Sequence, residues 1–104
     1  MSLWNMLFGA NGGASRINSN DARTLIEEQD AALIDVRSPG EYGGGHLPGA
    51  LNIPVDALMH RISEVPQDRP VVVYCRSGAR SARAAGILRQ HGRSAYDLGP
   101  MSAW

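Results

Sequence analysis

The residues from Val71 to Arg80 read VVVYCRSGAR and carry several signals of local structure close together. Val71–Tyr74 is a run of β-branched and aromatic residues, which is typical of a buried strand. Ser81–His91 is rich in alanine and is followed by Gly92, a residue type that commonly ends helices. We therefore predict a strand, a tight turn and a helix in this order.

Further strands and helices are expected to alternate on both sides of this unit. Asn18 with Asp21 three residues later is a near capping box, and Ala22 and Leu25 then lie on one face of the predicted helix. The other expected elements are strands over 31–36, 51–55 and 95–98 and a helix over 56–65. This alternation predicts a three-layer α/β/α sandwich with a central, mostly parallel sheet.

Size and composition exclude several classes of protein. The chain has 104 residues and 11.2 kDa, with 43% hydrophobic residues, which fits one compact domain. Ten basic and ten acidic residues balance, so no overall attraction to nucleic acid is expected. No apolar run approaches the roughly 20 residues of a transmembrane segment. Cys75 is the only cysteine, which excludes an intramolecular disulfide and fits a reducing compartment such as the cytoplasm.

The first fifteen residues differ from the rest of the chain. Apolar residues crowd the segment from Met1 to Phe8, and Gly9–Ser15 resembles a linker. The segment has neither the basic start nor the cleavage site of a secretory signal, so we expect no export. We predict an extension over 1–15 and a single domain over 16–104. The extension is either a tail or a hydrophobic anchor for a partner, a second copy or a membrane surface.

Cys75 is the strongest candidate for a reactive residue. Ligands of parallel sheets bind at the carboxyl ends of the strands, and Cys75 directly follows the strongest predicted strand. The turn would surround its sulfur with backbone N–H groups close to the positive end of a helix, while Arg76 and Arg80 add positive charge. Such surroundings favour the thiolate, which is the nucleophilic form. The alternative is that Cys75 is a small buried hydrophobic residue, as free cysteines often are.

Four motifs in sequence order resemble the rhodanese family. The loop from Cys75 to Arg80 is similar to the family's Cys-Arg-x-Gly-x-Arg active-site loop, and residues 42–50 resemble its aromatic-x-x-x-His-aliphatic-Pro-Gly-Ala signature. Residues 35–37 look like its Asp-Val-Arg segment, and residues 98–104 resemble its closing Gly-Gly-x-x-x-Trp. Two departures concern this last motif, because Pro100 replaces the second glycine and Trp104 is the last residue.

The resemblance implies a sulfurtransferase. We expect no metal or other cofactor, because one cysteine and scattered histidines offer no metal-ligand spacing and the chain has no glycine-rich nucleotide loop. Cys75 would take the outer sulfur of a small anionic donor such as thiosulfate, become a persulfide, and pass the sulfur to cyanide, a thiol or a protein cysteine. The loop implied to bind the donor and stabilise the persulfide consists of Arg76, Ser77, Gly78, Ala79 and Arg80. The two arginines would orient the donor, unless one of them pairs with a carboxylate to shape the loop.

The charged residues near the other motifs are expected to have supporting roles. Asp35, Arg37 and Glu41 carry opposite charges near the end of a predicted strand, which indicates a structural ion pair rather than catalysis. His46 is a candidate general base. However, a thiolate that is stabilised by loop dipoles needs no base, and the signature histidine of the family looks structural.

Three alternatives use the same residues differently. A rhodanese-like phosphatase or arsenate reductase would have a loop one residue longer, whereas here Ser81 stands where its arginine would be. A rhodanese-like interaction module without catalysis usually lacks the cysteine that this chain keeps. A persulfide carrier fed by another protein, such as a cysteine desulfurase, would keep the loop but turn over thiosulfate poorly.

Overall fold

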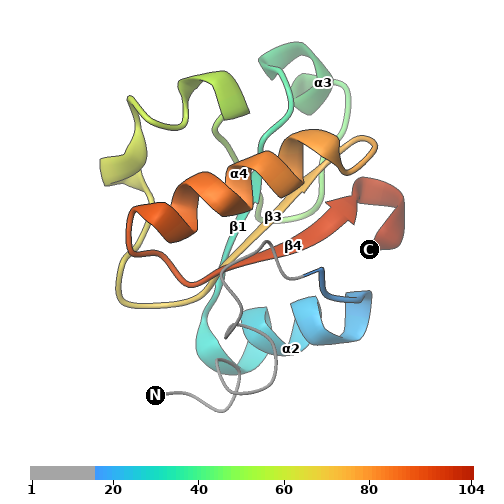
Figure 1. Ribbon diagram of the computed structural model, residues 1–104. Coiled ribbons are helices and arrows are strands. Elements are labelled where there is room, and N and C mark those ends of the chain that lie inside the picture. The colour runs from blue at the N-terminus through green and yellow to red at the C-terminus, as the bar shows by residue number, and fades with distance from the viewer. Residues whose placement is uncertain (1–15) are drawn as a thin grey trace.

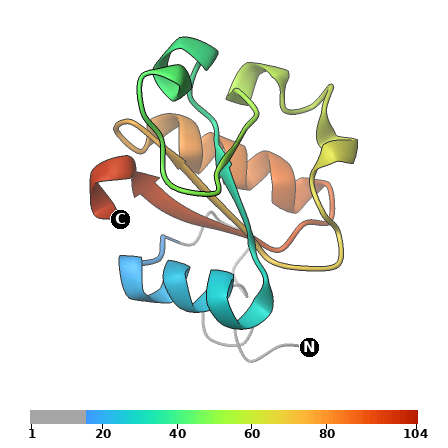
Figure 2. The ribbon, with the colours of Figure 1, turned by 180° about the vertical axis from the view of Figure 1, so that it is seen from behind.

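The computed structural model describes residues 16–104, which form a four-stranded parallel sheet between helices (Figure 1). The strand order is β2-β1-β3-β4, and the bounds are Ala32–Asp35 for β1, Leu51–Asn52 for β2, Val71–Cys75 for β3 and Ala95–Pro100 for β4. Helix α4 (Ala79–Gln90) covers one face of the sheet, and α2 (Ser19–Gln29) packs on the other, as the view from behind shows (Figure 2). The predicted three-layer sandwich is confirmed. The predicted extension over 1–15 lies outside the described residues.

Strand β3 holds the two halves of the core together. All five of its residues are buried, and it pairs in parallel with β1 on one side and β4 on the other. Successive side chains of a strand point to opposite faces. Val71, Val73 and Cys75 accordingly pack in the α4 layer, while Val72 and Tyr74 pack in the α2 layer. The strand therefore delivers Cys75 to the edge of the α4 core.

Helix α2 begins where the sequence predicts. The side chain of Asn18 accepts a hydrogen bond of 2.8 Å from the amide of Asp21, which satisfies one of the free N–H groups of the first turn. Ala22 and Leu25 are fully buried against the sheet. The helix ends before Asp30, whose left-handed conformation turns the chain so that the N–H of Ala31 donates to the carbonyl of Leu25 at 3.1 Å.

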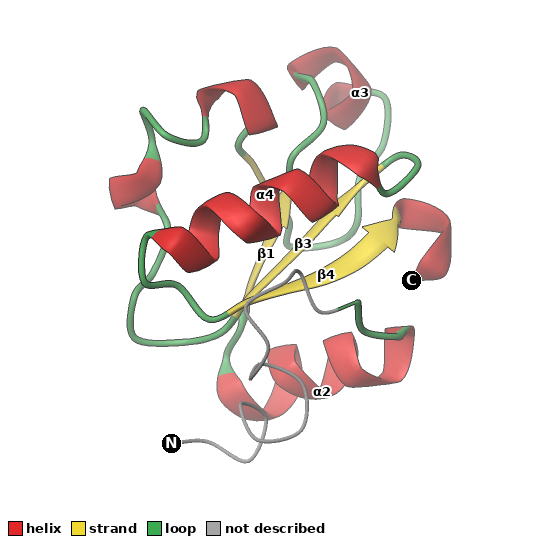
Figure 3. Cartoon of the chain, in the orientation of Figure 1, coloured by secondary structure: helices red, strands yellow, loops and turns green. Residues whose placement is uncertain are grey.

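The region between β2 and β3 differs from the sequence prediction. The expected helix over 56–65 is wrong: two 3₁₀ turns, Val55–Ala57 and Ile62–Glu64, take its place (Figure 3). The expected strand over 51–55 is shortened to two residues before Pro54. The buried guanidinium of Arg93 donates to the carbonyls of Ile62 and Val65, at the end of this region. These carbonyls thus have their partner in another part of the chain.

The short helix α3 (Pro39–Gly43) was not predicted, because its glycines resemble a loop. A complete capping box forms it. The Ser38 hydroxyl accepts from the amide of Glu41, and the Glu41 carboxylate accepts from the amide of Ser38. Helix α3 lies at the same end of the sheet as the turn between β3 and α4 (Figures 1 and 2).

Replacing Arg93 with alanine is expected to lower the free energy of unfolding by about 1 to 3 kcal/mol, because it leaves the buried carbonyl of Val65 without a donor. Arg83→Ala is the matched control. Its pair with Asp56 is exposed and 3.4 Å long, so a change within about 0.5 kcal/mol is expected. Denaturant unfolding measures both. Equal effects of the two substitutions would contradict the role given to Arg93.

Candidate active site

The sulfur of Cys75 lies where β3 turns into α4. Cys75 is the last residue of β3 and is buried. Its Sγ accepts hydrogen bonds from the amide of Gly78 at 3.0 Å and from the amide of Ser81 at 3.3 Å. Both amides belong to the first turn of α4, whose N–H groups have no partner within the helix. Gly78 has a φ of +106°, a conformation that glycine adopts without strain and that turns these amides toward the sulfur.

These contacts decide the protonation of the thiol. Burial raises the pKa of Cys75, because a charge is poorly solvated there. The Ser81 hydroxyl and the amides of Ser81, Gly78 and Ser77 act in the opposite direction and prevail, so that the pKa is below its ordinary value. The site therefore stabilises the thiolate relative to an ordinary cysteine, through backbone amides and one hydroxyl.

Strand β4 approaches the loop through a bulge. The pairing with β3 shifts between Val73 and Tyr74, and Gly99 follows with a φ of +85°. Its amide donates to the buried carboxylate of Asp97 at 2.7 Å. Pro100 then stands beside Cys75 in the register, so the unusual proline of the closing motif lies next to the loop that holds Cys75.

The guanidinium of Arg16 lies against the glycines of both segments. A Cβ on Gly99 would be 2.5 Å from Nη1 of Arg16, and a Cβ on Gly78 would be 3.1 Å from Nη2. Neither glycine can carry a side chain while Arg16 keeps this place. Arg16 also forms an ion pair of 3.4 Å with Asp97. The loop that holds Cys75 is therefore supported from behind by a residue at the start of the described chain.

Arg80 pairs with a carboxylate, which is one of the two roles that the sequence analysis gave for the loop arginines. Its two terminal nitrogens contact the two carboxylate oxygens of Glu41 at 2.7 and 3.0 Å. The pair links α4 to α3. Hydrogen bonds from Arg80 and from the backbone of Ser38 lower the pKa of Glu41 to about 2. Arg80 thereby fixes the position of the loop relative to α3.

Asp35 and Arg37 form the buried ion pair that their spacing suggests. Nη2 of Arg37 lies 2.6 Å from Oδ2 of Asp35 and 2.7 Å from the carbonyl of Gly45. The hydrogen bond to Asp35 raises the pKa of Arg37. Glu41 does not join this pair as a hydrogen-bond partner, because it binds Arg80. Asp35 and Arg37 instead hold the segment that follows α3.

An opening of about 290 Å³ lies beside the loop and is lined by Arg37, Glu41, Arg76, Met101 and Ser102. Arg76 is exposed there and has no hydrogen bond or ion pair within residues 16–104. It is the loop arginine whose guanidinium is available to a ligand. His46, in contrast, stacks on the ring of Tyr42 and contacts the Tyr42 carbonyl through Nδ1 at 2.9 Å.

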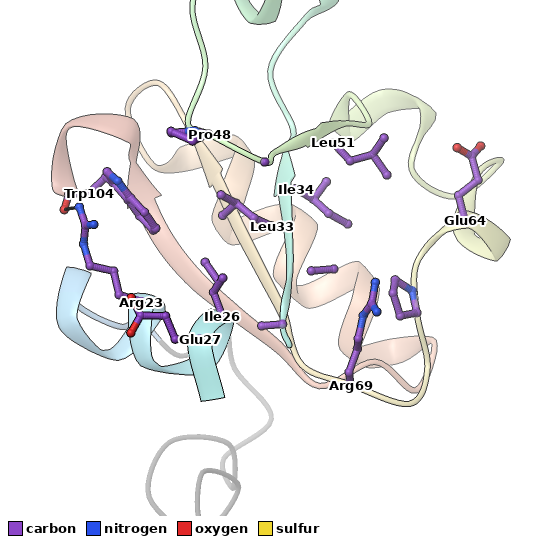
Figure 4. A pocket seen from close by; sticks show the side chains of 14 residues that line it. Arg23, Ile26, Glu27, Leu33, Ile34, Pro48, Leu51, Glu64, Arg69 and Trp104 are labelled. Atoms are coloured by element: carbon purple, nitrogen blue, oxygen red, sulfur yellow. Dashed lines mark hydrogen bonds between the residues drawn. The ribbon is translucent and has the colours of Figure 1, made fainter. Parts of the chain in front are cut away.

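A larger groove lies away from Cys75, at the sheet edge formed by β1 and β2. It has a volume of about 370 Å³ and runs between Trp104 and Arg23 at one end and Glu64 and Arg69 at the other (Figure 4). Leu33 lies between these ends, and none of the lining residues belongs to the loop of Cys75. The chemistry of the thiolate and this groove are thus separate features.

Three residues at the site were not given their roles by the sequence. Ser81 follows the recognised loop motif, Arg16 precedes the first predicted helix, and Glu41 lies far from Arg80 in the sequence. A hydroxyl in the first turn after a loop cysteine is a usable signal for Ser81, since this position faces the strand end. The contacts of Arg16 and the partner of Glu41 depend on the tertiary fold, and no local pattern indicates them.

The sequence profile of the rhodanese-like domain matches residues 18–104. The chain belongs to this family. A sulfurtransferase of Allochromatium vinosum is 42% identical over 85 residues, which cover 80% of this chain and 79% of that protein. The thiosulfate sulfurtransferase GlpE of Shewanella oneidensis is 33% identical over 85% of this chain and 89% of its own length. The human single-domain sulfurtransferase TSTD1 has a similar structure, with a TM-score of 0.73 and 30% identity over 88% of this chain and 93% of its own.

The rhodanese-like domain is expected to lose stability in acid through the pair of Glu41 and Arg80. The pKa of Glu41 is about 2 in the folded protein, below the ordinary value of 4.5, so its stabilisation is present above about pH 4.5 and is lost as the pH falls through 2. The difference in melting temperature between the wild type and Glu41→Gln should therefore shrink over this range. In an Arg80→Gln background the same substitution should change the melting temperature little. A difference that is constant from pH 5 to 2 would contradict this assignment.

Proposed function

We propose that this rhodanese-like domain is a thiosulfate or persulfide sulfurtransferase that works through a persulfide on Cys75. The Cys75 thiolate attacks the outer sulfur of the donor, the S–S bond of thiosulfate breaks, and sulfite leaves with the electron pair. A thiophilic acceptor such as cyanide, a thiol or a protein cysteine then attacks the outer sulfur of the persulfide and restores the thiolate. No proton is consumed in the cycle with thiosulfate and cyanide.

The observation that carries this proposal is the set of amides around Sγ of Cys75. Two N–H groups within 3.3 Å hold the sulfur, and they lower its pKa although it is buried. A fixed set of donors stabilises negative charge without having to reorganise during the reaction. The same set of donors suits the negative charge of the thiolate on Sγ. It also suits the negative charge of a persulfide, which lies on the outer sulfur. The relatives named sulfurtransferase add weight to this chemistry.

Within this proposal Arg76 receives the anionic donor. Its guanidinium lines the opening beside the loop and is unpaired within residues 16–104. Arg80 shapes the loop, because both of its terminal nitrogens are held by Glu41. The amides of Ser77, Gly78 and Ser81, which act on Sγ of Cys75, would stabilise the charge during transfer. A single free thiol is kept reduced in the cytoplasm, and we place the activity in that compartment.

The first expected result concerns sulfur loading. Reduced protein that is incubated with thiosulfate and desalted should gain the mass of one sulfur atom, and cyanide or a thiol should remove it. Cys75→Ser should gain no mass, because a serine hydroxyl does not attack the donor sulfur as the thiolate does. Intact mass spectrometry measures both. Absence of the added mass from the wild type, with Cys75 still open to alkylation, would refute thiosulfate as donor and indicate a protein-fed carrier or an interaction module.

A second expected result concerns Arg76. Arg76→Ala should raise the KM for thiosulfate at least about threefold, because one charged contact to the donor is lost, and leave melting temperature nearly unchanged. Arg83→Ala is the control. Arg83 belongs to α4 and is exposed, but it does not line the opening, so its loss should leave the KM for thiosulfate unchanged. Steady-state production of thiocyanate at several thiosulfate concentrations measures the effect. An unchanged KM in Arg76→Ala would remove this residue from the donor site.

A further inference from the structure

The hydroxyl of Ser81 contacts the sulfur of Cys75 and the loop carbonyl at the same time. Ser81 is completely buried at the third residue of α4. Its Oγ lies 3.4 Å from Sγ of Cys75 and 3.1 Å from the carbonyl oxygen of Gly78. Its amide is one of the two that hold the sulfur. Ser81 thus offers the sulfur a backbone donor and a side-chain group together.

This hydroxyl has one proton and two possible acceptors. In the thiol form the S–H of Cys75 donates to Oγ of Ser81, and the O–H of Ser81 donates to the carbonyl of Gly78. After deprotonation the sulfur can only accept. The O–H can then serve either the Gly78 carbonyl or the thiolate, and a hydrogen bond to a charged acceptor is the stronger one.

We propose that Ser81 is a catalytic residue whose hydroxyl turns from the Gly78 carbonyl to Sγ whenever Sγ carries the negative charge. When the charge moves to the outer sulfur of a persulfide, the hydroxyl returns to Gly78. The inference rests on the proposed function in taking Cys75 as the residue that carries the sulfur. It adds a group that distinguishes the thiolate from the persulfide, which the fixed backbone amides do not.

The two half-reactions should depend on Ser81 with different pH profiles. Stabilising the thiolate increases its population near neutral pH but makes each thiolate a weaker nucleophile. In the second half-reaction the acceptor attacks the outer sulfur, the S–S bond breaks and Sγ leaves with the electron pair. A stabilised leaving thiolate departs faster. Ser81 therefore assists loading at neutral pH by supplying thiolate, and it assists release at every pH.

The other charged groups near the loop do not produce this pattern. They comprise Arg76 and Arg80 of the loop and α4, Glu41 of α3, Asp35 at the end of β1 with Arg37 after it, and Asp97 of β4 with Arg16, which pairs with it. The arginines stay protonated throughout the useful pH range. Glu41 has a pKa of about 2 and is ionised there. His46 is turned to the carbonyl of Tyr42.

The test compares variants that keep or remove the hydroxyl. Ser81→Ala removes it, and the pair Ser81→Thr and Ser81→Val adds the same volume while only Thr keeps the hydroxyl. Circular dichroism checks that each variant folds. If Ser81→Ala does not fold, the comparison of Ser81→Thr with Ser81→Val still tests the role of the hydroxyl. Ser63→Ala is the control, because Ser63 is an exposed serine of the Ile62–Glu64 turn.

Alkylation by iodoacetamide is the first measurement, between about pH 5 and 10. Without the hydroxyl, the midpoint of the rate profile should move to higher pH, and the rate near pH 6 should fall roughly tenfold, the effect of losing one hydrogen bond to a charged group. The rate at the highest pH should not fall. Ser81→Thr and Ser63→Ala should follow the wild type. Coinciding profiles for Ser81→Thr and Ser81→Val would overturn the inference.

Release of sulfur is the second measurement. Protein loaded beforehand with one sulfur and mixed with cyanide should lose it several times more slowly without the hydroxyl, even at high pH. An unchanged release rate would also overturn the inference. Alkylation involves no sulfur donor, so its outcome is independent of whether thiosulfate loads the wild type. Failure of loading alone would refute the proposed donor, whereas equal alkylation profiles would refute the role of Ser81.

Discussion

A sulfur atom that has to carry negative charge lies at the buried end of β3, and its solvation is the constraint on which the surrounding structure depends. Water does not surround Cys75, and burial by itself raises the pKa of its thiol. Backbone N–H groups take the place of water. They are available because α4 begins at this point and its first turn has free donors, and Gly78 supplies the backbone conformation that directs them to the sulfur.

Two ion pairs hold this arrangement from the side of β1. The pair of Arg80 and Glu41 joins the start of α4 to the capping box of α3, so the loop is tied to α3. The pair of Asp35 and Arg37 is buried and is further tied to the carbonyl of Gly45. Buried pairs contribute little net stability, because desolvation of the charges costs about as much as their attraction returns. Their effect here is geometric, since they fix the segment that borders the opening beside Arg76.

Much of the fold was predictable because its central signals are local. The run Val71–Tyr74 and the capping residue Asn18 indicate β3 and α2 by residue type alone. The region over 56–65 was mispredicted, because its carbonyls at Ile62 and Val65 bind Arg93, a distant residue that no local pattern indicates. The same division holds for the site. The position of Cys75 follows from strand and turn, whereas the choice of Glu41 as partner of Arg80 depends on where α3 comes to lie.

The position of Arg16 shows that the segment matched by family similarity and the segment that contacts the loop of Cys75 do not begin at the same residue. The match to the rhodanese-like family begins at residue 18, two positions after Arg16. The guanidinium that fills the space behind Gly78 and Gly99 therefore comes from outside the segment defined by similarity. A fragment designed on the family boundary would keep every motif residue but lose the ion pair of Arg16 with Asp97 and the cover that Arg16 gives to these two glycines. The physical unit that shapes the thiolate site is longer than its recognisable sequence.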